Sequence, residues 1–171
     1  MVQVMQDPNG MSYWDVSQRI GFGSVGDDVR LVQYLLAVAP ASERYRPDIG
    51  GDSGLTVLDV DGVWGPQTAA AMAWYEQQTV NFGTLADSFV DPAPANTINF
   101  GPNNQYQFKI HSLQWFYIIA MSGGAQNMTD FGGGMSEVLM AMPNDGLCPS
   151  QLAFALTNAL TAAQSDPSNS P

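Results

Sequence analysis

Positively charged residues are scarce in this 171-residue sequence. Only 12% of its residues are charged, about half the usual share. The 16 Asp and Glu outnumber the 5 Lys and Arg, which gives a formal net charge of -11. Nucleic acids and anionic membrane surfaces are bound through clustered Lys and Arg. We therefore predict no nucleic-acid partner and no attachment to such membranes.

Histidine and cysteine each occur once, as His111 and Cys148. A catalytic zinc ion usually takes several His, Cys or carboxylate ligands, and structural zinc sites use paired cysteines. Neither set can be assembled, so we predict no metal site and no cofactor. His111 lies in the most apolar segment and is expected in the core or at an interface. Cys148 is expected to be a small packed residue at a helix start.

Motifs of covalent and acid–base catalysis are also missing. Serine catalysis would need His111 as its base, and no G-x-S-x-G turn is present. Glycoside hydrolysis needs two facing carboxylates, and no motif pairs Glu43, Glu76 or Glu137. We predict that the chain has no catalytic residues and is not an enzyme.

Long hydrophobic runs are absent. The most apolar stretch, 110–121, is interrupted by His111, Ser112 and Gln114 and is shorter than the ~20 residues of a membrane-spanning helix. The first twenty residues show neither a basic region nor an apolar region of a signal peptide. We predict no membrane insertion, no signal peptide and synthesis in a cytoplasm.

Helical patterns dominate what is present, so the predicted fold class is mainly α. Apolar spacing, proline and glycine positions predict helices over 27–39, 66–78, 108–122, 135–142 and 149–164. The first 23 residues are predicted to be an irregular arm with a short helix near 14–19. Segments 40–60 and 79–106 are rich in Gly, Pro, Asp or Asn and are predicted to be loops, the first ending in an extended stretch.

Each of the first two predicted helices, 27–39 and 66–78, carries a short motif that begins just before the helix. The first is Gly26-x-x-Val29-x-x-Val32-Gln33-x-x-Leu36, and the second is Asp61-Gly62-x-Trp64-Gly65-x-x-Thr68-x-x-Ala71 followed by Met72 and Tyr75. Asp-Gly predicts a tight turn because Gly tolerates positive φ. Trp64 is expected to close one end of a helical bundle, and Thr68 to cap or pack against the second helix.

Together these motifs resemble the peptidoglycan-binding domain family. That resemblance implies a three-helix bundle, here with a long loop insertion around 42–55 and additional C-terminal helices. A second D-G-x-x-G string that usually follows is missing, and Glu76 stands where the family has Gln. We expect the third bundle helix to come from 108–122. The expected organisation is an arm at 1–23, the bundle domain at 24–122, and a helical extension with a tail at 123–171.

Candidate ligand contacts are few. Trp74 falls beside the predicted core face of its helix and is the best candidate for an exposed aromatic, with Tyr75 and Asp61 as weaker binding candidates. The loop carboxylates do not follow calcium-binding spacing; they are Asp48, Asp52, Asp59 and Asp61. GFGSVG at 21–26 matches G-x-G-x-x-G, but no buried strand precedes it and acidic residues follow it. We interpret it as a flexible loop.

The combined prediction is a non-catalytic structural protein of a bacteriophage particle, either tail-associated or capsid-decorating. The peptidoglycan-binding-like domain would serve assembly, host cell-wall attachment, or both. Expected partners are other protein subunits and possibly peptidoglycan, and the expected location is the virion. The alternative is a bacterial peptidoglycan-binding subunit that targets a larger complex to the cell wall.

Overall fold

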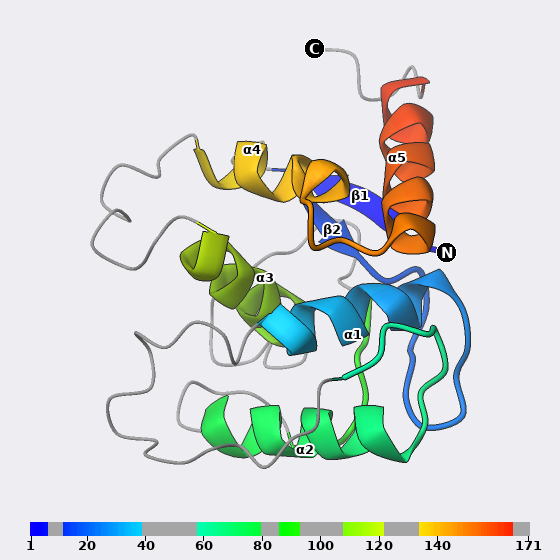
Figure 1. The fold of residues 1–171 in the computed structure, drawn as a ribbon, viewed down its shortest axis with the longest axis vertical. Helices are drawn as coiled ribbons and strands as arrows, with labels where there is room; N and C mark the ends of the chain where they lie inside the picture. The colour runs from blue at the N-terminus through cyan, green and yellow to red at the C-terminus, as the bar shows by residue number, and fades with distance from the viewer. Residues whose placement is uncertain (7–11, 39–57, 80–85, 93–107, 122–133, 166–171) are drawn as a thin grey trace.

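The computed structural model of the chain is mainly helical, as predicted, and includes a small antiparallel sheet (Figure 1). The structure describes residues 1–6, 12–38, 58–79, 86–92, 108–121 and 134–165. The elements in chain order are β1 Gln3–Gln6, β2 Ser12–Asp15, α1 Asp27–Val38, α2 Pro66–Thr79, α3 Phe108–Met121, α4 Gly134–Met140, the 3-10 turn η6 Met142–Asn144, and α5 Ser150–Ser165.

The N-terminal arm corrects one sequence prediction, because the expected short helix near 14–19 does not form. Strands β1 and β2 pair instead, with Val4 opposite Trp14. The side-chain amide of Gln114, on α3, donates to the Trp14 carbonyl oxygen (2.7 Å) and accepts from the Trp14 N–H (2.8 Å). It satisfies the outer edge of β2 as a third strand would. The aromatic residues of this segment favour the strand conformation.

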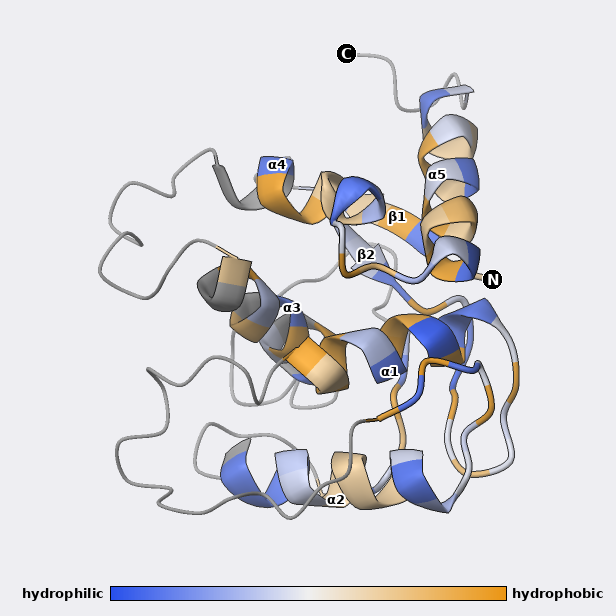
Figure 2. Cartoon of the chain, viewed as in Figure 1, coloured by the Kyte–Doolittle hydropathy of each residue, from blue (hydrophilic) through white to orange (hydrophobic). Residues whose placement is uncertain are grey.

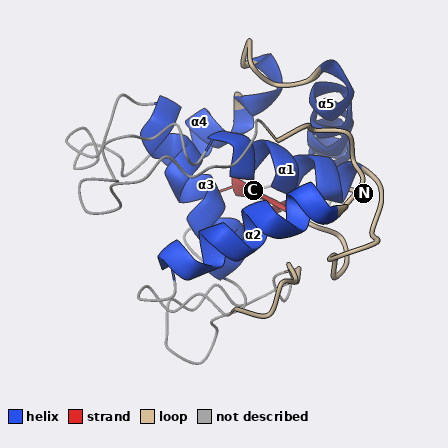
Figure 3. Ribbon diagram, turned by 60° about the horizontal axis from the view of Figure 1, so that its bottom comes forward, coloured by secondary structure: helices blue, strands red, loops and turns tan. Residues whose placement is uncertain are grey.

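Helix α1 forms the centre of the molecule. Nine of its twelve residues are buried, which is more than one face of a surface helix provides. It packs against α2, α3 and α5. In Figure 1 the sheet, α4 and α5 lie on one side of α1 and α2 lies on the other, and Figure 3 shows the same arrangement from below.

Aromatic contacts join α3 to the two preceding helices. The rings of Tyr34 on α1 and Tyr117 on α3 are 6.0 Å apart, and Tyr75 on α2 meets Phe116 on α3 edge-on at 6.1 Å. Helices α1, α2 and α3 therefore contact one another. The bounds of all three helices agree with the sequence predictions to within one residue at each end.

The C-terminal elements differ in detail from the prediction. The expected helix 135–142 ends at Met140, and Pro143 lies inside the following 3-10 turn rather than stopping a helix before it. Helix α5 buries only Leu152 and Leu156, while Phe154 is on its exposed side. Figure 2 shows hydrophobic and hydrophilic residues alternating along the ribbon of α5. None of the described helices has the length and apolar character needed to cross a membrane.

Several predictions concern parts of the chain outside the described residues. These are the whole insertion around 42–55, the parts 80–85 and 93–107 that include most of the predicted loop 79–106, the segment 122–133 and the tail 166–171. The side chains of His111 and Trp115 also lie outside the description, although α3 itself includes both positions. The loop carboxylates Asp48 and Asp52, which do not follow calcium-binding spacing, belong to the same undescribed part.

Candidate functional site

The two motifs meet in a short antiparallel pairing, which we call the motif ribbon and define as residues 21–26 and 62–65. Val25 and Val63 are directly opposite one another in it. Three main-chain hydrogen bonds, each 2.9 Å, hold the two segments together: Gly23 N–H to Trp64 O, Trp64 N–H to Ser24 O, and Gly26 N–H to Gly62 O. The first segment is thus one side of a hydrogen-bonded ribbon rather than a free loop.

Glycine is required at the bends of the ribbon. Gly23, Gly26 and Gly62 have φ values of 87°, 118° and 81°, which side-chain-bearing residues rarely adopt. At Gly62 a Cβ atom would also lie 2.8 Å from Cζ of Arg30. The G-x-G-x-x-G pattern is therefore explained by backbone geometry, and its Gly23 and Gly26 amides already donate within the protein.

Gln33, on α1, connects the two motifs. Its Nε2 donates to Asp61 Oδ1 (2.9 Å), to the Val63 carbonyl (3.1 Å) and to Thr68 Oγ1 (3.0 Å). Its Oε1 accepts from the Gly62 N–H (2.8 Å). Gln33 and Thr68 are both 1% exposed. One buried amide thus fixes the turn, the ribbon and the start of α2 against α1.

The apolar motif positions form the core beneath this network. Trp64 is 1% exposed, which confirms the prediction that it packs inside, and its indole N–H has no hydrogen-bond partner among the described residues. The other buried apolar motif residues are Val29, Val32, Leu36, Ala71, Met72 and Tyr75. Gly65 accepts the Ala69 N–H at the start of α2. The structure therefore brings together the residues that carried the family resemblance.

The three candidate contact residues have different surroundings. Asp61 is exposed, and hydrogen bonds from the Gln33 side chain and then the Val63 N–H lower the pKa of its carboxyl. Trp74 is partly buried and packs against the core. Tyr75 is 1% exposed, and its hydroxyl bonds to the Ser112 hydroxyl on α3. Asp61 is therefore the most accessible of the three side chains.

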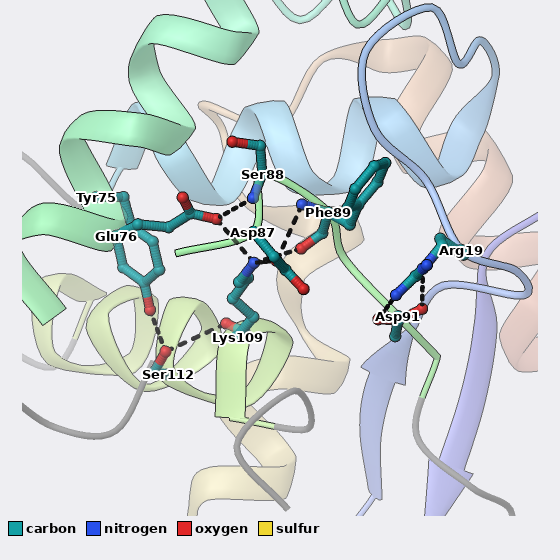
Figure 4. Close-up of polar contacts among 9 residues, drawn as sticks. All are labelled: Arg19, Tyr75, Glu76, Asp87, Ser88, Phe89, Asp91, Lys109 and Ser112. Atoms are coloured by element: carbon teal, nitrogen blue, oxygen red, sulfur yellow. Dashed lines mark hydrogen bonds and ion pairs between the residues drawn. The ribbon is translucent and has the colours of Figure 1, made fainter. Parts of the chain in front are cut away.

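A buried ion cluster near α2 and α3 was not predicted from the sequence. Lys109 is 1% exposed, and its ammonium donates to Glu76 Oε1 (2.7 Å), to Asp87 Oδ1 and to the Phe89 carbonyl (2.6 Å) (Figure 4). Glu76 also accepts the Ser88 N–H (2.9 Å). Glu76 and Asp87 are therefore the two counter-ions of a buried lysine.

The electrostatics of this cluster favour a structural role. Burial alone would raise the pKa of Asp87, but the hydrogen bond from Lys109 and the Phe89 N–H keep it below the ordinary value. The Lys109 ammonium has three acceptors and almost no contact with solvent. It ties segment 86–92 to two helices. The sequence signal for it was the one lysine of the chain, in a predominantly apolar helix.

A second polar cluster joins α1, α3 and the segment after η6. The hydroxyls of Tyr34 and Tyr117 both donate to Asp145 Oδ2, the second at 3.3 Å. Burial, reinforced by Asp145, raises the pKa of both tyrosines well above the ordinary value. Burial and then the charge of Asp145 raise the pKa of Cys148 to about 11. The thiol is protonated at neutral pH and is a poor nucleophile.

No group of three or more His, Cys, Asp or Glu side chains within the described residues is placed to hold a metal ion. The polar clusters that are present link elements of the fold: Gln33 joins the motifs, Lys109 joins α2, α3 and segment 86–92, and Asp145 joins α1 and α3. Each has its donors directed at acceptors of the same chain. Each cluster therefore stabilises the packing of the elements that it joins.

Apolar side chains lie on the surface of the motif ribbon. Phe22, Val25 and Val63 are 71%, 68% and 49% exposed. Next to the ribbon, the ring of Phe89 lies against Gly21, where an added Cβ would be only 2.6 Å from it. The Arg19 guanidinium stacks 4.9 Å from the centre of the Phe89 ring. It also forms a two-pronged ion pair with Asp91, at 2.6 and 3.0 Å (Figure 4).

The comparisons with known proteins do not assign this arrangement to a family. No protein-family model, no curated protein and no solved structure matches the chain.

Proposed function

We propose that the chain is a non-catalytic structural subunit of a bacteriophage particle, tail-associated or capsid-decorating. In this proposal its peptidoglycan-binding-like domain serves assembly, host cell-wall attachment, or both. The observation that carries the proposal is the motif ribbon. Its polar motif groups are bonded to one another through Gln33, while Phe22, Val25 and Val63 face solvent.

The helical arrangement supports the resemblance on which the proposal rests. Helices α1, α2 and α3 contact one another, and α3 lies at 108–121, where we expect the third bundle helix. Trp64 closes the core beneath the ribbon. In the proposal, these three helices are the peptidoglycan-binding-like scaffold, and the strands β1 and β2 and the helices α4 and α5 are additions to it.

The chemistry of the described side chains supports a non-catalytic role. The buried Lys109 is matched by Glu76 and Asp87, and the Cys148 thiol is held protonated. A general base or nucleophile needs an accessible, deprotonated atom with an available lone pair, and neither the Lys109 ammonium nor the Cys148 thiol provides one. Exposed apolar side chains on a rigid ribbon suit protein–protein packing instead.

The alternative is a bacterial subunit that binds peptidoglycan and directs a larger complex to the wall. The accessible Asp61 carboxylate favours it, since it could accept hydrogen bonds from sugar hydroxyls or a peptide stem. Its weakness is that Tyr75 is buried and Trp74 is packed against the core. An aromatic platform for a sugar ring is therefore not presented by this part of α2.

Two measurements on the full chain test the proposal. Particles are purified from the phage whose genome encodes this chain. Quantitative mass spectrometry should find the chain in them at a fixed number of copies per particle. Absence from the particles would contradict the structural role. Sedimentation with purified sacculi then separates the two uses of the domain: a chain that stays in the supernatant serves assembly, and one that sediments saturably serves attachment.

A further inference from the structure

We infer that the ribbon patch, defined as Phe22, Val25 and Val63, docks a neighbouring protein whose contact surface is apolar and flanked by Lys and Arg. The inference rests on the proposed function and names the partner chemistry for it. The three side chains are among the most exposed large apolar residues of the described chain. Two of them, Val25 and Val63, are directly opposite in the ribbon and so share one face.

Main-chain hydrogen bonds within the free chain hold the backbone that carries the patch. Main-chain hydrogen bonds run on both sides of Val25, through Ser24 and Gly26, to the segment that contains Val63. The Ser24 N–H also donates to the Gly21 carbonyl (2.9 Å), which closes the turn that presents Phe22. Binding to such a surface orders little of the chain, so less conformational entropy opposes it.

The charges around the patch select a basic partner. The two nearby cations are already paired within the chain, Arg30 with Asp27 (2.8 Å) and Arg19 with Asp91 (2.6 Å). Asp59 and Asp61 lie in the segment leading into Val63, and neither is in an ion pair among the described residues; Arg30 acts on Asp61 only from beyond ion-pair distance. Asp61 is held ionised by its hydrogen bonds. The local excess is therefore negative, as is the net charge of -11.

The same charges disfavour a second copy of this chain as the occupant. Two copies meeting at this patch would bring two pairs of unmatched carboxylates together, and like charges facing each other across an interface are unfavourable. A glycan is also disfavoured, because two of the three exposed side chains are aliphatic and offer no stacking face. A protein surface with apolar side chains inside a ring of Lys and Arg satisfies both features.

Binding of a designed probe to the full chain tests the inference. The probe is an amphipathic helical peptide of Leu and Lys, of about 18 residues or roughly five turns. Its control has Glu in place of every Lys. We expect the Leu/Lys peptide to bind, to weaken as salt is raised, and to shift amide NMR signals of residues 21–26 and 62–65. We expect the Leu/Glu peptide not to bind there.

Matched variants separate a defined patch from general stickiness. Phe22→Ser removes an aromatic that is 71% exposed, and Phe154→Ser removes one that is 70% exposed on α5. We expect Phe22→Ser to weaken binding at least about tenfold, and Phe154→Ser to leave it within about twofold. Val25→Thr keeps the β-branched shape and should also weaken binding.

Four results would overturn the inference: no binding, equal binding of both peptides, signal shifts spread over α5, or a dimer of the chain formed through the patch. Particle composition is measured separately. If the chain is present in particles but does not bind the Leu/Lys peptide, only the docking surface is refuted. A chain that binds the peptide as expected but is absent from particles refutes only the structural role.

Discussion

Replacing Gln33 by Met tests whether one buried amide holds the two motifs together. Methionine keeps the length and unbranched shape of the side chain but removes both its donors and its acceptor. Gln33→Met therefore breaks four hydrogen bonds, to Asp61, Gly62, Val63 and Thr68, with little change of volume.

The size of the effect follows from which partners stay buried. The Gly62 N–H has no other acceptor in the described structure, and leaving such a group unpaired costs about 1 to 3 kcal/mol. The Thr68 hydroxyl loses a neutral hydrogen bond worth about 1 kcal/mol, since its alternative at the Val63 carbonyl is 3.5 Å away. Asp61 is exposed and is rehydrated. We expect Gln33→Met to lower the free energy of unfolding by about 2 to 4 kcal/mol.

Urea denaturation followed by tryptophan fluorescence measures this loss. Gln67→Met is the matched control, because Gln67 is an exposed residue on α2 and should change stability by less than about 0.5 kcal/mol. An NMR titration adds a second readout: the pKa of Asp61 should rise towards its ordinary value when the Gln33 amide is removed. A stability loss below about 1 kcal/mol together with an unchanged Asp61 pKa would refute the reasoning.

Three further predictions concern two buried tryptophans, the buried Lys109 and the partly buried Cys148. Trp14→Phe should cost about 1 to 3 kcal/mol more than Trp64→Phe in thermal or urea unfolding, because the Trp14 indole N–H donates to a main-chain carbonyl of α4 (2.7 Å) whereas that of Trp64 is unpaired; equal losses would contradict this. Lys109→Met should cost about 3 to 5 kcal/mol at neutral pH. Because the folded-state pKa of Asp87 is lowered, its stabilising contribution is present above the unfolded-state pKa of about 3.9 and is lost as pH falls through the folded value. The difference between Lys109→Met and the unchanged chain should therefore narrow in acid, and a pH-independent difference would argue against the ion cluster. Cys148 in the folded chain should react with iodoacetamide at pH 7.4 at least about tenfold more slowly than in the urea-unfolded chain, because a pKa raised from 9.0 to about 11 lowers the fraction of thiolate. Similar rates would contradict the partial burial of the thiol.

The helices could be predicted from the sequence because their signals are local. Pro66 marks the start of α2, and the apolar spacing of Val29, Val32 and Leu36 identifies α1. The pairing of β1 with β2 could not be predicted in the same way. The main-chain N–H and carbonyl of Trp14, on β2, bond to the side chain of Gln114, a hundred residues further along the chain. The sequence around Trp14 does not indicate that partner.

For the candidate site, the sequence predicted the turn and the buried tryptophan, but it did not predict which apolar side chains are exposed. The motifs indicated a turn at Gly62 and a buried Trp64, and both are present. Apolar residues are ordinarily assigned to the core, so the exposure of Val25 and Val63 follows only from their pairing in the ribbon. The counter-ions of Lys109 likewise come from segments whose approach depends on the tertiary fold.

The structure of an intact particle tests the central claim most directly, because it would show the chain among its neighbours. A cryo-electron microscopy map of the particle should place the chain at a regular position, with Phe22, Val25 and Val63 buried against an apolar surface that carries Lys or Arg at its rim. A map in which the chain is present but this patch faces solvent would contradict the docking surface. A particle without the chain would contradict the structural role.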